Sequence, residues 1–144
     1  MLLNPADAST LEGYDASQLT TADTFFYNPG LFSSGSVTLY SESNISSAAA
    51  GYVVPFTGEI YLAAYKATHD AGYPSVSWQA DIYKNYVLLD SEVILYAGAL
   101  PSPGVLKTLA YPVVAGDIIG ARAIINAAGL RAPWVKVYIR RAVA

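Results

Sequence analysis

The sequence contains no cysteine, which excludes disulfide bonds, thiolate nucleophiles and cysteine-based metal sites. It contains one histidine, His69, which supplies too few ligands for a zinc site and is expected with Asp70 in an exposed hairpin loop. No apolar run approaches the roughly 20 residues of a membrane-spanning helix. The start, Met1-Leu2-Leu3 followed by Asn4-Pro5, predicts no secretory signal. We therefore expect no metal, no cofactor and no membrane partner.

Charge is also scarce, because only 13% of the residues are charged whereas 53% are hydrophobic. A chain of this composition cannot cover itself with charge, so part of its apolar surface is expected to be buried against other subunits or a partner. The twelve tyrosines favour the same interpretation, because tyrosine packs well and still tolerates water. The alternative is a monomer whose surface consists of serine, threonine and tyrosine.

Positive charge is absent from the first part of the chain, since no lysine or arginine precedes Lys66. Residues 1–50 carry five acids, Asp7, Glu12, Asp15, Asp23 and Glu42. Such an acidic leading segment either docks on basic neighbours, including copies of the same chain, or is simply solvated. The basic residues are scattered apart from Arg140-Arg141, so nucleic acid is not an expected partner.

Short strands separated by turn residues dominate the rest of the chain. The stretch 51–68 predicts two strands that meet at a bend, Pro55–Gly58. The segment Ser75–Tyr83 alternates with a period of two, which predicts one buried and one polar face. Further strands are predicted at Val37–Tyr40, Val87–Tyr96 (interrupted at Asp90-Ser91-Glu92), Val105–Val113, Ile118–Asn126 and Trp134–Arg141. About eight strands without a long helix favour a β-sandwich or barrel.

Residues 1–32 show no clean periodicity, and we interpret them as an arm before a domain formed by residues 33–144. The triplet Phe25-Phe26-Tyr27 is too apolar to remain in water. One hypothesis is that it anchors the arm on a neighbouring surface. The other hypothesis is that it belongs to an irregular first strand that closes the domain's own core.

Catalytic chemistry has little support in the sequence. Four carboxylates could pair for glycoside hydrolysis, namely Glu59, Asp81, Glu92 and Asp117, but structural roles on strands and in turns are favoured. No nucleophile elbow, P-loop or dinucleotide fingerprint is present, and we predict that the chain is not an enzyme. Trp78 alternates with core residues, whereas Trp134 could stack on a sugar ring.

Three segments in order carry a resemblance to a known group of proteins. They are Y-V-V-P-F-T-G-E-I at Tyr52–Ile60, A-D-I-Y-K-N at Ala80–Asn85, and P-V-V-A-G-D-I-I-G-A-R-A at Pro112–Ala123, closed by P-W-V-K-V-Y-I at Pro133–Ile139. This pattern resembles the jelly-roll modules of small bacteriophage virion proteins, most of all capsid decoration (cement) proteins. It departs from them at Asn85-Tyr86, where Asn-Gly is usual, so the type of that hairpin stays open.

The resemblance implies an all-β, jelly-roll-like antiparallel β-sandwich of about eight strands with an irregular N-terminal arm. It also implies a homotrimer that binds the major capsid protein outside a phage head, made in the host cytoplasm and located in the virion. The absence of a shaft or coiled coil favours decoration over a fibre tip. The expected interface residues are Phe25, Phe26, Tyr27, Asp7, Glu12, Asp15 and Asp23. The alternative is a receptor- or glycan-binding tail module that uses Trp134 and Tyr73.

Overall fold

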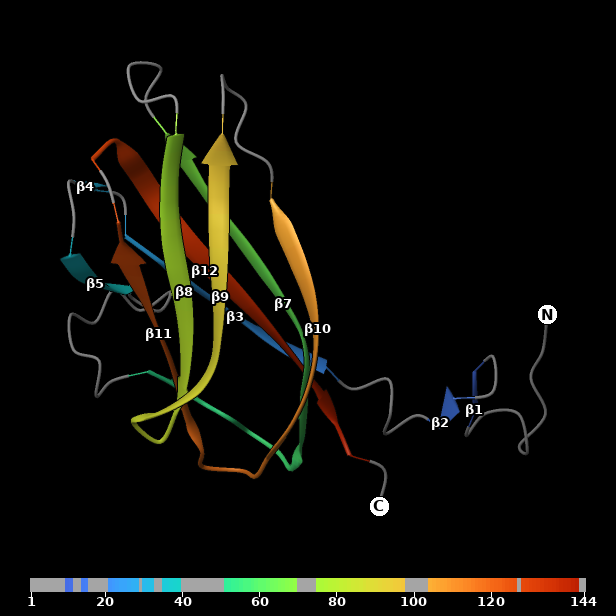
Figure 1. Cartoon of the computed structure of the whole chain (residues 1–144). Helices are drawn as coiled ribbons and strands as arrows, with labels where there is room; N and C mark the ends of the chain where they lie inside the picture. The colour runs from blue at the N-terminus through green and yellow to red at the C-terminus, as the bar shows by residue number, and fades with distance from the viewer. Residues whose placement is uncertain are drawn as a thin grey trace.

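The protein is a β-sandwich in which every described regular element is a strand (Figure 1). The computed structural model describes residues 10–11, 14–15, 21–28, 30–32, 35–39, 51–69, 75–97, 104–126 and 128–142. Two sheets of four main strands pack face to face, and all strand pairs are antiparallel.

The first sheet has the strand order β10-β7-β12-β3, with the short β4 beside β12. Its strands are β3 (Thr21–Tyr27), β4 (Leu31–Phe32), β7 (Gly58–His69), β10 (Val105–Val113) and β12 (Leu130–Arg141). The second sheet has the order β5-β11-β8-β9, with β6 beside β11. Its strands are β5 (Gly35–Leu39), β6 (Tyr52–Val53), β8 (Ser75–Lys84), β9 (Val87–Ala97) and β11 (Ile118–Ile125). Among the described strands, β1 (Thr10–Leu11) and β2 (Tyr14–Asp15) pair only with each other.

The eight main strands are paired in a nested way. Counted along the chain, the first strand pairs with the eighth, the second with the seventh, the third with the sixth and the fourth with the fifth. A chain folded into one long hairpin and then wrapped into two sheets has this pairing, which is the topology of a jelly roll. The predicted all-β, jelly-roll-like antiparallel sandwich of about eight strands is therefore confirmed.

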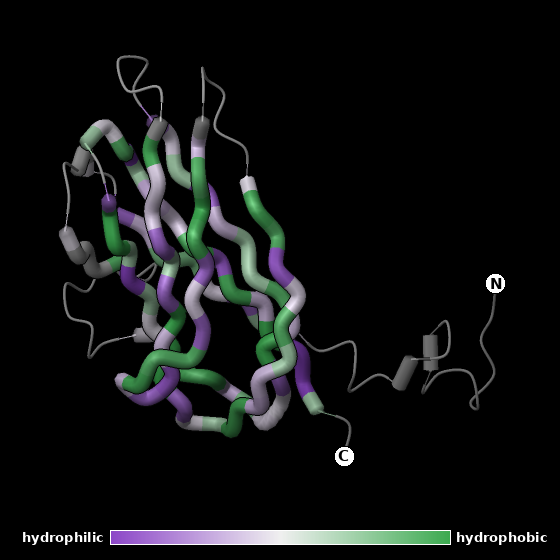
Figure 2. Tube along the Cα trace, viewed as in Figure 1, coloured by the Kyte–Doolittle hydropathy of each residue, from purple (hydrophilic) through white to green (hydrophobic). Residues whose placement is uncertain are grey.

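The core lies between the sheets because the strands alternate buried and more exposed residues, as along β11 and β12. Figure 2 shows hydrophobic and hydrophilic residues following one another along the strands. The largest fully buried side chains include Trp78, Tyr65, Tyr96 and Phe26. The predicted core position of Trp78 is confirmed, since its side chain is fully buried. Burying a side chain such as Phe26 contributes about 1.5–3 kcal/mol to folding.

A two-residue turn, Asn85-Tyr86, joins β8 to β9, with φ values of 51° and 68°. Two positive φ values define a type I′ turn, which settles the hairpin type that the sequence left open. Asn85 Nδ2 donates to Asp117 Oδ1 over 2.9 Å, and Asn85 Oδ1 accepts from the Ile118 N–H over 2.9 Å. These bonds fasten the hairpin to the turn before β11, where Gly116 has φ 95°.

Residues 21–27 require a correction to the predicted boundary at residue 32. They form β3, which pairs with β12 along its whole length, so this segment belongs to the sandwich and not to an arm. The alternation of a strand divides the aromatic triplet, because Phe26 is 1% exposed in the core whereas Phe25 and Tyr27 face outward. The first-strand hypothesis therefore holds for these residues. Residues 1–20, apart from β1 and β2, lie outside the described residues.

Candidate functional site

The outer surface of the first sheet carries aromatic and basic side chains in alternation along β12. Val135, Val137 and Ile139 are fully buried in the core. The period of two therefore turns the intervening residues outward, in the order Trp134, Lys136, Tyr138 and Arg140. We call this surface, together with its neighbours on β3 and β7 described below, the aromatic–cation face.

Neighbouring strands extend the aromatic part of this face. On β3, the ring of Phe25 lies 5.4 Å from that of Trp134 and 5.5 Å from that of Tyr27. On β7, the ring of Tyr61 lies 6.4 Å from that of Tyr138. These side chains are half-buried, so their rings form a platform whose upper surface is open to a partner.

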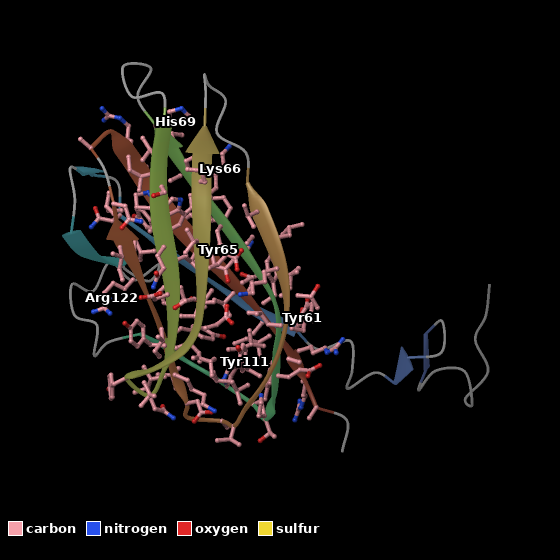
Figure 3. All side chains as sticks on the ribbon, viewed as in Figure 1. Tyr61, Tyr65, Lys66, His69, Tyr111 and Arg122 are labelled. Carbon is pink, nitrogen blue, oxygen red and sulfur yellow. The ribbon has the colours of Figure 1, made fainter. Side chains whose placement is uncertain are left out.

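Cations lie between and beside these rings. Lys136 Nζ is 5.2 Å from the centre of the Tyr138 ring, and the Arg140 guanidinium is 5.2 Å from that of Tyr61. Arg140 forms an ion pair with Glu59. Lys66 on β7 is the register partner of Trp134, and Figure 3 shows it on the same strand as Tyr61, nearer to His69. Neither Lys66 nor Lys136 forms an ion pair with a carboxylate among the described residues.

The charge of the chain is unevenly divided between the sheets. The four main strands of the first sheet contain two acids, Asp23 and Glu59. They hold six of the chain's eight basic residues, namely Lys66, Lys107, Arg131, Lys136, Arg140 and Arg141. An aromatic platform with excess positive charge is suited to an acidic partner that has apolar or planar groups.

A second candidate surface follows the edge strands of the two sheets, β9 in the second sheet and β10 in the first. Val93 and Leu95 on β9 are 62% and 63% exposed, and Leu106 on β10 is 71% exposed. With Val87 and Leu88, these residues make up five of the eight large apolar side chains that are exposed in the described part of the chain. We call these five residues the apolar edge.

Ion pairs between β9 and β10 connect the two sheets next to the apolar edge. Asp90 and Glu92 on β9 point between the sheets, because their partners on β8 face the core. Lys107 Nζ lies 3.0 Å from Asp90 and 2.9 Å from Glu92, and the Tyr111 hydroxyl donates to Asp90 over 2.8 Å. The hydrogen bond to Glu92 raises the pKa of Lys107, and that to Asp90 raises the pKa of Tyr111. Charges that point inward in this way protect edge strands against unwanted pairing.

These contacts explain why β9 is continuous. The polar residues Asp90-Ser91-Glu92 suggested that a bend interrupts the strand, but β9 runs from Val87 to Ala97 with only a register shift against β8 next to Asp90. Asp90 and Glu92 find partners on the opposite sheet, and Ser91 turns outward to the carboxylate of Asp81. A polar run can therefore stay in a strand when each residue has a partner on its own side.

The outer surface of the second sheet contains a closed polar network around Asp81. This residue is 1% exposed, and its Oδ1 accepts from Gln79 Nε2 over 2.8 Å and from Ser91 Oγ over 2.7 Å. Arg122 Nη2 lies 3.9 Å from Asp81 Oδ2 and also contacts the Tyr83 hydroxyl. The Asp81 carboxylate is thus held by its neighbours and has no solvent-facing side for a substrate.

The other carboxylates that were candidates for a hydrolytic pair also have structural contacts. Asp117 accepts hydrogen bonds from Asn85 and from the Val114 N–H, and these bonds lower its pKa. Glu59 pairs with Arg140, and Glu92 pairs with Lys107. No group of three potential metal ligands occurs among the residues that the structure describes.

The structure brings together some of the residues that the sequence singled out. Phe25, Tyr27 and Trp134 lie in contact on the aromatic–cation face, and Asp23 is exposed beside them, paired in register with Tyr138. Phe26 is not an interface residue of the folded domain, because the strand alternation buries it. Of the remaining predicted contacts, Asp7, Glu12 and Tyr73 lie outside the described residues, and Asp15 is described only as part of β2.

His69 differs from its predicted position in an exposed loop. It ends β7, is 4% exposed, and stacks on Tyr96 with a distance of 5.7 Å between ring centres. Sequence reasoning also did not assign Lys66, Lys136, Tyr61 and Tyr138 to a binding surface. The outward alternation of Lys136, Tyr138 and Arg140 was a usable signal, but their neighbours on β3 and β7 depend on long-range strand pairing.

Comparison with protein-family models gives no match. Comparison with curated proteins identifies no relative either. Within the described ranges of the chain, no helix has the length and the apolar character needed to cross a membrane.

Proposed function

We propose that this chain is a structural virion protein that decorates the outside of a phage head as a homotrimer and stabilises the shell. The apolar edge carries this proposal. Val93 and Leu95 lie on the outer side of the edge strand β9 and Leu106 lies on the outer side of the edge strand β10, so an isolated monomer exposes them to water. A second copy of the chain buries these side chains, and interfaces of this kind are typically more apolar than the remaining surface.

Two further observations support the proposal. The nested strand pairing is that of a jelly roll, the fold implied by the resemblance to decoration proteins. The chain also carries few charges for its size. In this proposal, self-association uses the apolar edge, and the major capsid protein is the other partner. Many copies bound to one lattice reinforce the shell by avidity even when each contact is weak.

The test measures two properties of the chain, its oligomeric state in solution and its binding to phage heads. Sedimentation equilibrium should give three times the chain mass, and the chain should co-sediment with phage heads. Replacing Leu95 and Leu106 together by serine should yield monomers and weaken head binding about tenfold or more. Val53→Ser is the matched control, because Val53 is a similarly exposed apolar residue outside the apolar edge. A wild-type chain that stays monomeric, or does not co-sediment with heads, contradicts the proposal.

A second candidate function is glycan or receptor recognition by a tail or fibre module. The contact of Trp134 with Phe25, and of Phe25 with Tyr27, favours it, because flat clusters of aromatic rings stack on sugar rings. A glycan array should then show saturable binding that Trp134→Ala abolishes and Tyr86→Ala leaves intact. Immunogold labelling separates the two functions, because decoration predicts label over the head and receptor binding predicts label at the tail tip.

A further inference from the structure

The distribution of charge along the chain is opposite to that on the first sheet. Residues 1–20 carry Asp7, Glu12 and Asp15 and no basic residue. The first sheet, by contrast, has the excess of lysine and arginine described above, and two of its lysines lack a described carboxylate partner. Complementary charge on two surfaces favours their association and fixes its orientation.

We propose that the aromatic–cation face binds the acidic leading segment, residues 1–20, of a second copy of this chain. The inference rests on the proposed homotrimer and names one of its contacts. Acidic side chains of the leading segment lie beside Lys66 and Lys136, and its apolar residues, such as Leu11 and Tyr14, pack on the rings of Trp134 and Tyr138.

The position of β3 makes such an exchange geometrically feasible. The leading segment enters the fold at Thr21, which pairs with Arg140 at one end of the aromatic–cation face. Twenty residues reach up to about 65 Å when extended. The twelve residues of β12 span about 40 Å at the usual rise of a strand. The segment is thus long enough to leave its own sandwich and to cover the same face of a neighbour.

The described part of the leading segment does not add to its own sandwich. β1 and β2 pair with each other and with neither sheet, and Figure 1 shows them beside the sandwich, beyond the end of β3. A segment that every copy gives to the next forms a heterologous contact, and such contacts close into a ring when the rotation allows it. In a ring of three copies, every acidic segment is bound and every aromatic–cation face is occupied.

Isotope-resolved cross-linking tests which copy provides the segment. The full chain with Tyr14→benzoylphenylalanine is prepared unlabelled and mixed with ¹⁵N-labelled chain that lacks the cross-linker. After irradiation, mass spectrometry should show Tyr14 of unlabelled chains joined to labelled peptides from β12 or β7. Cross-links confined to unlabelled peptides would show that the segment binds its own copy. Cross-links to other strands would show that this face is not the acceptor. Either result overturns the inference.

Charge reversal tests the chemistry of the contact. Lys66→Glu with Lys136→Glu should weaken self-association about tenfold or more at low salt, and so should Asp7→Lys with Glu12→Lys and Asp15→Lys. Combining both sets should restore association, because the charges are again complementary. The restoration also shows that the face variant still folds. Lys84→Glu, a reversal on the second sheet, is the matched control. A combined variant that self-associates as weakly as the two separate charge-reversed variants would overturn the inference.

The outcomes separate this inference from the proposed function. A chain that binds phage heads as a trimer but gives no cross-links between copies refutes the exchanged segment and leaves decoration standing. A chain that gives cross-links between copies but does not bind heads supports the exchange and removes the virion function.

Discussion

The outer faces of the two sheets use their charged residues in different ways. On the second sheet, Asp81 is buried by its own neighbours and accepts hydrogen bonds from Gln79 and Ser91. On the first sheet, Lys136 lies over an aromatic ring and has no described carboxylate partner. Both residues alternate with core residues on central strands, so the sequence pattern alone does not separate them.

The difference lies in what each charge does for the fold. A buried carboxylate whose partners are removed costs free energy, so the network around Asp81 is part of the folded structure. A partly exposed lysine beside tyrosine adds little to stability, because water solvates it well in either state. We infer that charges in closed networks maintain the sandwich, and that the unpaired cations of the aromatic–cation face are available to a partner.

Asp81→Ala should have the largest effect on stability. It leaves half-buried hydrogen-bond donors of Gln79 and Ser91 without their acceptor and should lower the free energy of unfolding by about 2–4 kcal/mol. Urea denaturation followed by tryptophan fluorescence measures the change. Asp23→Ala on the other face is the matched control and should change stability by at most about 0.5 kcal/mol, since Asp23 is exposed. If Asp81→Ala and Asp23→Ala lowered the free energy of unfolding equally, the distinction between the two outer faces would be contradicted.

Asp117→Ala should have an intermediate, pH-dependent effect. The hydrogen bonds from Asn85 and Val114 favour the charged carboxylate and lower its pKa below the ordinary value of 3.8. The stabilisation is therefore complete above that value and is lost as the pH falls through the lowered pKa of the folded state. The variant should be about 1 kcal/mol less stable than wild type near pH 7.

The difference between wild type and Asp117→Ala should shrink as the pH falls below the ordinary carboxyl pKa of 3.8. Denaturation curves at several pH values measure it. Asp117 lies in a turn and on neither outer face. Its variant therefore shows how the stability of the sandwich depends on pH when neither outer face is changed. A difference that stays constant with pH would show that the charge of Asp117 does not stabilise the turn.

Lys136→Gln should have the smallest effect on stability, at most about 0.5 kcal/mol. It keeps part of the aliphatic stem and removes the positive charge that lies over Tyr138. Self-association at low salt should nevertheless weaken, whereas the main effect expected for Asp81→Ala is on stability. Sedimentation velocity and urea denaturation on the same sample test both statements. A loss of stability without a change in association would place Lys136 with the fold-maintaining charges.

Much of the fold could be predicted from the sequence where one face of a strand is buried. The alternation in Ser75–Tyr83 and in Trp134–Arg141 predicted both the strands and their inward residues, and the structure has these residues in the core. The bend at Pro55–Gly58 was also predicted, and it separates β6 from β7. Such local patterns are readable because strand periodicity is set by backbone geometry.

The candidate site was harder to predict because it depends on pairing between distant segments. Phe25-Phe26-Tyr27 appeared to be one apolar unit, and only pairing with β12 shows that Phe26 faces the core while its neighbours face outward. Similarly, Asp90 and Glu92 appeared to interrupt a strand, because their partner Lys107 lies on the other sheet. Sequence spacing contains no direct information about such neighbours.

The nested pairing of the strands also sets an order in which the protein can fold. The hairpin of β8 and β9 needs only the turn Asn85-Tyr86, whereas β3 pairs with β12, the last strand of the chain. Closing long loops before their contacts form costs chain entropy, so pairing should proceed outward from this hairpin and be slow. During synthesis β3 has to wait until β12 has left the ribosome. The aromatic–cation face is therefore the last surface to be assembled, and a partner that requires it binds only completed chains.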